Sequence, residues 1–260
     1  EDIAQSKVLH LEGYQIEGQT KGTVLHAIEL AKRHGTLVSI DLADPGVIRR
    51  NKEFLQSFVP SHTDIVFVNE NEAFEFTGMQ NEEAVRELGK HCKVAIVKIG
   101  KEGSYVYNDN VMSKISGYPA NAIDTTGAGD SYAAGFLYAY CNDWPVDDAG
   151  RLGSLFASKV VEQKGVGMND INGEELKRFV RSNAGENNTK GQDSSQEVNY
   201  TSEITAESSA NKNIKIGIIG GSGLDDPNIL QDAEDKIAET EFGSPSSPLK
   251  RGKIGGVDVV

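Results

Sequence analysis

The chain has 260 residues, of which 38% are hydrophobic and 25% charged, a composition typical of a folded globular protein with one large core or two smaller ones. Its formal net charge of -13 argues against binding to a nucleic-acid backbone, which requires a basic surface. No apolar run approaches the ~20 residues that would cross a bilayer, so we expect neither a nucleic acid nor a membrane as partner.

The chain begins with Glu1 rather than Met, and no basic-then-apolar leader follows. We therefore expect neither a signal peptide nor an intact natural start in this sequence. Cys92 and Cys141 lie in apolar, helix-like surroundings without a partner at metal-ligand spacing. This pattern predicts buried reduced thiols, and with them a cytoplasmic location.

Residues 1 to about 182 alternate between helix-like and strand-like segments. Short apolar runs that follow amphipathic stretches predict strands at residues 36–41, 64–69 and 94–100. Such strands, separated by helices, predict an α/β fold with a doubly wound, mainly parallel sheet and helices on both faces. Residues 104–113 then predict a β-hairpin with its turn at 108–110.

Three helix-like stretches follow, at residues 127–141, 147–164 and 173–182. Residues 183–213 are polar and almost empty of large apolar side chains, which predicts a disordered linker. From residue 214 an apolar strand pattern returns and opens a second, short, β-rich unit that ends at residue 260. The predicted domains are therefore 1–182 and 214–260, and the second is too short for an independent core.

The most informative run is Asp-Thr-Thr-Gly-Ala-Gly-Asp-Ser at residues 124–131, which opens a predicted helix. A helix start presents backbone N–H groups without internal partners and the positive end of the helix dipole. Small residues at 127–129 let an anion approach those amides, and Asp130 lies beside them in the first turn. From spacing alone, a tight turn with an acid that complements the dipole is an equally good interpretation.

This run resembles the C-terminal signature of the PfkB family of carbohydrate and nucleoside kinases, and the resemblance extends over residues 1 to about 182. It implies a ribokinase-like kinase domain that transfers the γ-phosphoryl group of ATP to a hydroxyl. By resemblance, Gly127, Ala128 and Gly129 form the anion hole and Asp130 is the catalytic base.

An Asn-x-x-Glu pattern follows the strand predicted at 64–69. The family has such a motif at this position, which implies that Asn69 and Glu72 organise Mg²⁺ and its waters around the ATP phosphates. Mg²⁺ prefers oxygen ligands and keeps several waters, which suits an amide and a carboxylate. The alternative is a plain helix N-cap at Asn69 or Asn71.

Two glycine segments resemble the family's nucleotide border. Lys98, Gly100 and Gly103 lie at the end of a strand, where backbone can approach a ligand, although a hairpin turn needs the same glycines. Gly165 falls where the family closes the adenine pocket, although a helix C-cap explains it equally well. The implied cofactors are ATP and Mg²⁺.

Segments 9–14 and 39–45 look most like the adenosine kinase-like branch of the family, although Asp41 and Asp44 could equally be turn residues. The expected partner is thus a small nucleoside or sugar, and formation of a homo-oligomer stays open. The family would also have a further stretch of sheet and a lid before Glu1, which supply most substrate contacts. An inactive kinase module that serves only as an interaction domain is the remaining alternative.

Residues 214–230 and 240–257 resemble the N-terminus of methylthioadenosine phosphorylase, in the purine nucleoside phosphorylase family. That resemblance implies a fused purine-salvage enzyme, with inorganic phosphate as co-substrate and Ser222 as a phosphate contact. A hydroxyl among flexible backbone amides is a reasonable cradle for an oxyanion. A plain strand-to-loop turn is the alternative.

Overall fold

The computed structural model describes residues 2–166, 217–218, 231–236, 249–254 and 257–259. The helix predicted at 173–182, the predicted linker and the glycine turn at Ser222 lie outside the described residues. Both cysteines are free and buried, as predicted. No helix in the described part of the chain is long and apolar enough to span a membrane.

A seven-stranded sheet forms the centre of the molecule, in the order β6-β5-β4-β3-β2-β1-β7. Neighbours from β7 through β1, β2 and β3 to β4 are parallel, whereas β5 and β6 are antiparallel additions at one edge. The strands are β1 (Val8–Glu12), β2 (Leu37–Asp41), β3 (Ile65–Asn69), β4 (Val94–Lys98), β5 (Gly103–Asn108), β6 (Val111–Ser116) and β7 (Gly217–Ile218).

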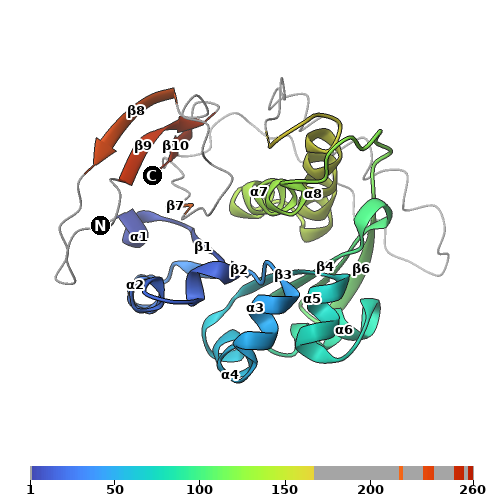
Figure 1. The fold of residues 1–260 in the computed structure, drawn as a ribbon, viewed down its shortest axis with the longest axis horizontal. Helices are drawn as coiled ribbons and strands as arrows, with labels where there is room; N and C mark the ends of the chain where they lie inside the picture. Colours follow the sequence, from blue (N-terminus) through green and yellow to red (C-terminus); the bar gives the residue numbers. More distant parts are fainter. Residues whose placement is uncertain (1, 167–216, 219–230, 237–248, 255–256, 260) are drawn as a thin grey trace, which may run out of the picture.

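Helices cover both faces of this sheet (Figure 1). One face carries the helices that connect the parallel strands, and two later helices cover the other. The first set is α1 (Asp2–Gln5), α2 (Thr20–His34), α3 (Pro45–Arg50), α4 (Lys52–His62), α5 (Glu70–Thr77) and α6 (Asn81–Gly89); the second is α7 (Ala128–Cys141) and α8 (Val146–Val160).

Helices lie on both faces as predicted, and the parallel strands add outward from β1, with β2, β3 and β4 toward one edge and β7 toward the other. Among the described strands, β1 to β4 add in one direction, so every connecting helix lies on the same face. Right-handed crossovers place all connecting helices on the same face of the sheet when successive parallel strands add in one direction. The second layer comes instead from α7 and α8, which follow the β5–β6 hairpin.

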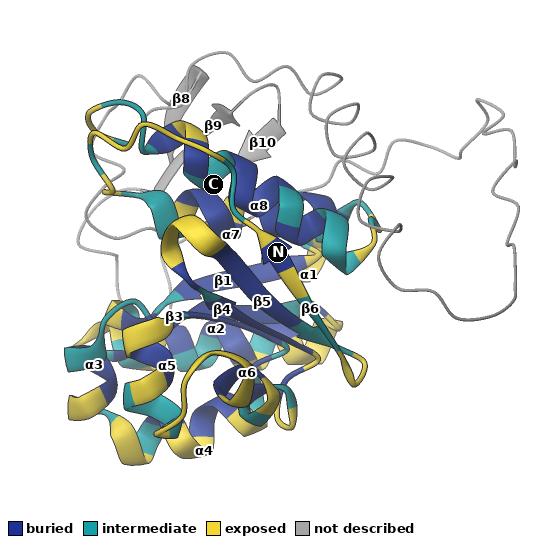
Figure 2. Cartoon of the chain, turned by 90° about the vertical axis from the view of Figure 1, so that its right-hand side faces the viewer, coloured by how far each residue is buried: buried dark blue, intermediate teal, exposed yellow. Residues whose placement is uncertain are grey.

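The strands are buried on both sides, which explains their nearly continuous apolar runs. In β3, Val66 and Val68 pack with the connecting helices, while Ile65 and Phe67 pack under α7 and α8. Figure 2 shows these buried strands between helices whose outer surfaces are exposed. The core under α7 and α8 is aromatic, and Phe67 meets the ring of Phe136 edge-on at 5.5 Å.

The predicted strands and hairpin are confirmed with small shifts at their ends. The β5–β6 turn places Asp109 at φ 48° and Asn110 at φ 65°, the left-handed pair that a two-residue hairpin turn requires. The helix predicted from residue 127 begins at Ala128, after Gly127 as N-cap. The helix predicted at 147–164 spans Val146–Val160 and ends four residues early.

Strands β8 (Gln231–Lys236), β9 (Leu249–Ile254) and β10 (Val257–Val259) form a separate antiparallel sheet in the order β10-β9-β8. Strand β7 pairs with β1 through the main chain, Leu9 opposite Gly217 and His10 opposite Ile218. The division into domains at 182 and 214 stays a prediction.

Candidate active site

Each of the four parallel strands β1 to β4 ends on a polar residue: Glu12, Asp41, Asn69 and Lys98. In the strand register Glu12 is the partner of Asp41, and Asn69 is the partner of Lys98. The carboxyl ends of parallel strands share one edge of a sheet, where ligands bind in open α/β folds. These four side chains therefore meet at the edge expected to carry a site.

A buried ion pair lies at the centre of this edge. Lys98 Nζ is 2.5 Å from Asp41 Oδ2, and the two side chains are only 14% and 4% exposed. Burial lowers the pKa of Lys98, but the charges of Asp41 and Glu72 outweigh it and keep the pKa above its ordinary value. The ammonium is therefore charged, and it compensates carboxylates that would otherwise be isolated in the interior.

The amino end of α7 is shaped by glycine and left uncapped by side chains. Gly127 is the N-cap at φ 76°, and within the described residues the helix start has no side-chain capping hydrogen bond. A Cβ at Gly127 would lie 2.7 Å from Val166 Cγ1, so a larger residue does not fit. The N–H of Ala128 donates to the Thr125 carbonyl at 3.2 Å, so one amide of the predicted anion hole already has a turn partner. Asp130, in the first turn, is exposed.

The start of α7 lies against the ends of the strands. A Cβ built on Gly129 would be 3.0 Å from Lys98 Nζ, so the ammonium sits beside the backbone of the first helical turn. Burial raises the pKa of Glu12, and the negative charge of Asp130 adds to that rise. The structure thus brings Asp130, Gly129 and Lys98 together, as the assignment of one site requires.

A buried hydrogen bond fixes α7 to the sheet below it. Tyr132, in the second turn of the helix, and Ser104 of β5 share a hydrogen bond of 2.7 Å between their hydroxyls. The Tyr132 ring also packs edge-on against Phe67 of β3, with 6.4 Å between centroids. These contacts fix the position of α7 on the sheet, and with it the direction of the amino end of the helix.

The Asn69 and Glu72 pair forms a reciprocal capping box at the start of α5. Asn69 Oδ1 accepts from the Glu72 N–H at 2.9 Å, and Glu72 Oε2 accepts from the Asn69 N–H at 2.7 Å. Burial, together with the charge of Asp41, raises the pKa of Glu72 to about 7. The N-cap interpretation is therefore confirmed for Asn69, and a role in Mg²⁺ binding stays a prediction.

No group of three or more His, Cys, Asp or Glu side chains in the described residues is arranged to hold a metal ion. Glu72 nevertheless keeps lone pairs beyond the bonds to Asn69, since a carboxylate accepts about four hydrogen bonds. It is only 2% exposed. The pair therefore suits an ion reached through bound water better than one ligated directly.

The glycines predicted to border a nucleotide have structural reasons of their own. Gly100 (φ 57°) and Gly103 (φ 105°) shape the one-turn 3₁₀ helix η2 (Gly100–Glu102) between β4 and β5. A Cβ at Gly103 would meet the Ile115 carbonyl oxygen at 2.0 Å. Gly165 lies beyond the end of α8, so it is not that helix's C-cap. Its N–H instead donates to Asp124 Oδ2 at 3.2 Å.

The sequence predicts Lys98 at the border of the nucleotide, leaves Asp41 open between a family pattern and a turn residue, and assigns no role to Glu12. It does not predict the ion pair between Lys98 and Asp41. Two residues before Glu12 on β1, His10 Nδ1 shares a hydrogen bond of 3.0 Å with Ser39 Oγ of β2. A usable signal was present, because each of these acids ends an apolar strand.

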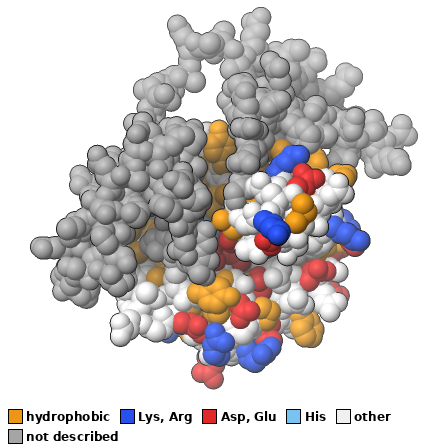
Figure 3. Space-filling model, turned by 45° about the horizontal axis from the view of Figure 1, so that its top comes forward, with side chains coloured by type: hydrophobic (Ala, Val, Ile, Leu, Met, Phe, Trp, Pro, Cys, Tyr) orange, Lys and Arg blue, Asp and Glu red, His pale blue; other side chains and the backbone are white. Residues whose placement is uncertain are grey.

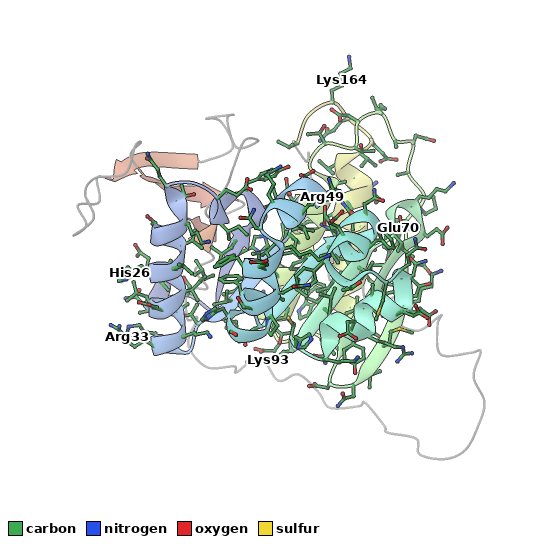
Figure 4. All side chains as sticks on the ribbon, turned by 60° about the horizontal axis from the view of Figure 1, so that its bottom comes forward. His26, Arg33, Arg49, Glu70, Lys93 and Lys164 are labelled. Atoms are coloured by element: carbon green, nitrogen blue, oxygen red, sulfur yellow. The ribbon has the colours of Figure 1, made fainter. Side chains whose placement is uncertain are left out.

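Two cavities lie elsewhere on the described surface, and neither is lined by Glu12, Asp41, Asn69 or Lys98. One is lined by residues of α3, α5 and the turn before α6, including Arg49 and Glu70, both of which Figure 4 labels. The other lies at the amino ends of β1 and β2, beside Tyr140 and Trp144. Asp130 lines neither. On the face in Figure 3, acidic and basic side chains are interspersed.

Comparisons with known proteins agree on one family. A family profile described as pfkB family carbohydrate kinase matches residues 1–172. The 5-dehydro-2-deoxygluconokinase of Geobacillus kaustophilus is 31% identical over 171 residues, which are 61% of this chain and 51% of that protein. The nucleoside kinase of Methanothermobacter thermautotrophicus is 40% identical over 120 residues, 45% of this chain and 38% of the relative.

Among solved structures, adenosine kinase from Sinorhizobium meliloti aligns with a TM-score of 0.63 at 32% identity. The alignment covers 70% of this chain and 57% of that one. The chain spans about half the length of the curated relatives it matches.

Proposed function

Because the chain belongs to the pfkB family of carbohydrate kinases, we propose that it supplies the phosphoryl-transfer part of an ATP-dependent kinase for a nucleoside or sugar hydroxyl. One observation carries the proposal: the uncapped start of α7 meets a buried lysine at the carboxyl edge of the sheet, and an exposed aspartate stands beside both.

In this proposal Asp130 is the general base. Its carboxylate takes the proton of the acceptor hydroxyl while that oxygen forms a bond to the γ-phosphorus of ATP and the bond to the β-phosphate oxygen breaks. The amides of Gly127, Ala128 and Gly129 stabilise the charge on the moving phosphoryl group. The long 3.2 Å bond from Ala128 to Thr125 would have to yield for that amide to take part.

Residues around this centre would hold the nucleotide and its metal. Asn69 and Glu72 would orient the waters of Mg²⁺, which, when bound, supplies positive charge to the phosphates. Lys98, Gly100 and Gly103 would border the phosphates, and Gly165 would close the base pocket from the loop after α8. Lys164, next to it, lies at the outer end of that loop (Figure 4).

The relatives include a 5-dehydro-2-deoxygluconokinase, a nucleoside kinase and an adenosine kinase. We therefore take a sugar or a nucleoside as acceptor, with the adenosine-like branch favoured by the patterns at segments 9–14 and 39–45. The alternative, a non-catalytic interaction module, predicts no phosphoryl transfer with any acceptor.

The test is conversion of ATP to ADP by the full-length protein with adenosine and with several sugars. Asp130→Asn should lower kcat by ~10²–10⁴, the usual contribution of a general base. Asp147→Asn is the matched control, because Asp147 lies in the first turn of α8 next to Val146, which lines the cavity at the amino ends of β1 and β2, the opposite ends of the strands from the proposed site. A kinase rate within about tenfold of wild type for Asp130→Asn would refute the base assignment.

A second activity is proposed for the segment after residue 214 on sequence resemblance alone. There, Ser222 would contact inorganic phosphate in the phosphorolysis of methylthioadenosine, within a fused purine-salvage enzyme. Release of adenine from methylthioadenosine by the full-length protein tests this. Ser222→Ala should reduce that activity and leave phosphoryl transfer unchanged.

A further inference from the structure

Lys98 is one buried ammonium among several carboxylates. Its side chain is 14% exposed, its partner Asp41 is 4% exposed, and Glu72 nearby is 2% exposed. Glu12 and Asp130 add two further negative charges around the same edge. Without a cation here, the edge would repel the phosphates that the proposed function brings to it.

The two arginines of α3, the helix that follows β2, are paired with glutamates. In α3, Arg49 bonds to Glu75 at 2.7 Å, and Arg50 bonds to Glu17 at 3.0 Å. Both arginine side chains are mostly exposed, at 68% and 60%. Lys98 differs because its ammonium points at backbone of the first turn of α7, where a Cβ on Gly129 would be 3.0 Å away.

We propose that Lys98 is the side-chain cation that faces the transferred phosphoryl group, and that Asp41 is the positioning residue that holds it there. The inference rests on the proposed kinase function and deepens it, by giving Lys98 a role in the transition state rather than at the border of the nucleotide. The ammonium would bring positive charge to the phosphoryl group, and the neighbouring amides of the helix start would donate hydrogen bonds to it.

Asp41 is well placed to fix the ammonium. Its Oδ1 accepts a hydrogen bond from the N–H of Ala43 at 3.1 Å, and its Oδ2 pairs with Lys98. The carboxylate is thereby held by its own turn, and the ammonium is held by the carboxylate. A cation fixed before the reaction costs no reorganisation during the reaction.

The decisive variant removes both charges at once. Asp41→Asn with Lys98→Met removes one charge of each sign, so the net charge of the edge is unchanged, and Glu72 keeps its hydrogen bonds to Asn69. The protein should therefore keep its fold, which its Tm checks. We expect kcat to fall by ~10²–10³ and the affinity for ADP to change by less than about threefold. Affinity for ADP with aluminium fluoride, which mimics the moving phosphoryl group, should fall by about 10².

A control uses another lysine–aspartate pair, at the opposite ends of the strands. Lys93 and Asp64 are 2.9 Å apart at the amino ends of β4 and β3. Lys93 lies on the opposite side of the molecule from Arg49 and Glu70 (Figure 4). Asp64→Asn with Lys93→Met should leave kcat and both affinities unchanged.

Asp41→Asn alone tests the positioning role. It keeps the ammonium, so kcat should fall by only about tenfold, with partial recovery in Asp41→Glu. If the double variant has a wild-type Tm and a kcat within threefold of wild type, Lys98 does not face the phosphoryl group. If the wild-type protein transfers no phosphoryl group at all, the proposed function fails, and this inference fails with it.

Discussion

The carboxylate of Asp124 accepts a hydrogen bond from the N–H of Gly165, which lies 41 residues later in the chain, at 3.2 Å. Its other oxygen accepts from the N–H of Thr126 at 2.9 Å. One side chain therefore joins the loop before α7 to the loop after α8, and Val166 in the second loop packs against Gly127. These two loops border the amino end of α7, where the anion hole is proposed.

Asp124→Ala should loosen both loops and raise the KM for ATP by roughly fivefold, because two backbone N–H groups lose their acceptor. Asp124→Asn keeps one carbonyl acceptor, so its KM for ATP should lie between those of Asp124→Ala and wild type. Hydrogen exchange at the amides of Thr126 and Gly165 gives the direct measurement. Equal exchange rates in all three proteins would contradict the proposed link between the loops.

Gly127→Ala should lower the free energy of unfolding by about 1–2 kcal/mol, since Gly127 has φ 76° and its added Cβ would crowd Val166. Gly22→Ala is the matched control. Gly22 lies within α2, and nothing comes within 4 Å of a Cβ there, so alanine should stabilise by about 0.5–1 kcal/mol. Urea unfolding of both variants measures the two effects, and a stabilised Gly127→Ala would refute the strain argument.

The elements of this fold could be predicted because their signals are local. The strand ending at Asp41, the strand ending at Asn69 and the hairpin turn were all present in short stretches of sequence. The signature around Asp130 likewise needs only eight consecutive residues. Periodicity and turn chemistry act over such distances, so they specify elements well.

Contacts between elements could not be predicted in the same way. Lys98 and Asp41 are 57 residues apart, and their pairing depends on the order of β2, β3 and β4 in the sheet. The double winding was inferred from alternation of strands and helices, which does not determine the direction in which strands add. The sequence pattern at Asn69 likewise fits two interpretations, a helix N-cap and a residue that orients Mg²⁺.

The hydroxyl pair of Ser104 and Tyr132 offers a test of how α7 is attached to the sheet. Ser104→Ala leaves the buried Tyr132 hydroxyl without its partner and should cost about 1–3 kcal/mol of stability. Ser104→Ala with Tyr132→Phe removes both hydroxyls and should cost less than the sum of the two single changes. A double-mutant cycle from urea unfolding measures the difference. Strictly additive costs would mean that the two hydroxyls do not interact.

Stability should depend on pH through Glu12, whose side chain is 19% exposed at the end of β1. Burial raises the pKa of Glu12 above its ordinary value, against the lowering effect of His10. A carboxyl group with a raised pKa in the folded state binds more protons when folded than when unfolded. Its ionisation therefore destabilises the fold, and stability declines as pH rises from the ordinary glutamate pKa through the raised one.

Glu12→Gln should remove that decline. The amide oxygen can still accept the hydrogen bond that the Glu12 side chain receives from the N–H of Gln15, so the start of η1 (Gly13–Ile16) is kept. The Tm of the variant minus the Tm of wild type should increase as pH rises through the acidic range, because only wild type loses the stability that depends on a protonated Glu12. Glu53→Gln, on the exposed surface of α4, should reproduce the wild-type profile. Parallel profiles for wild type and Glu12→Gln would show that burial at this strand end does not disfavour the Glu12 carboxylate.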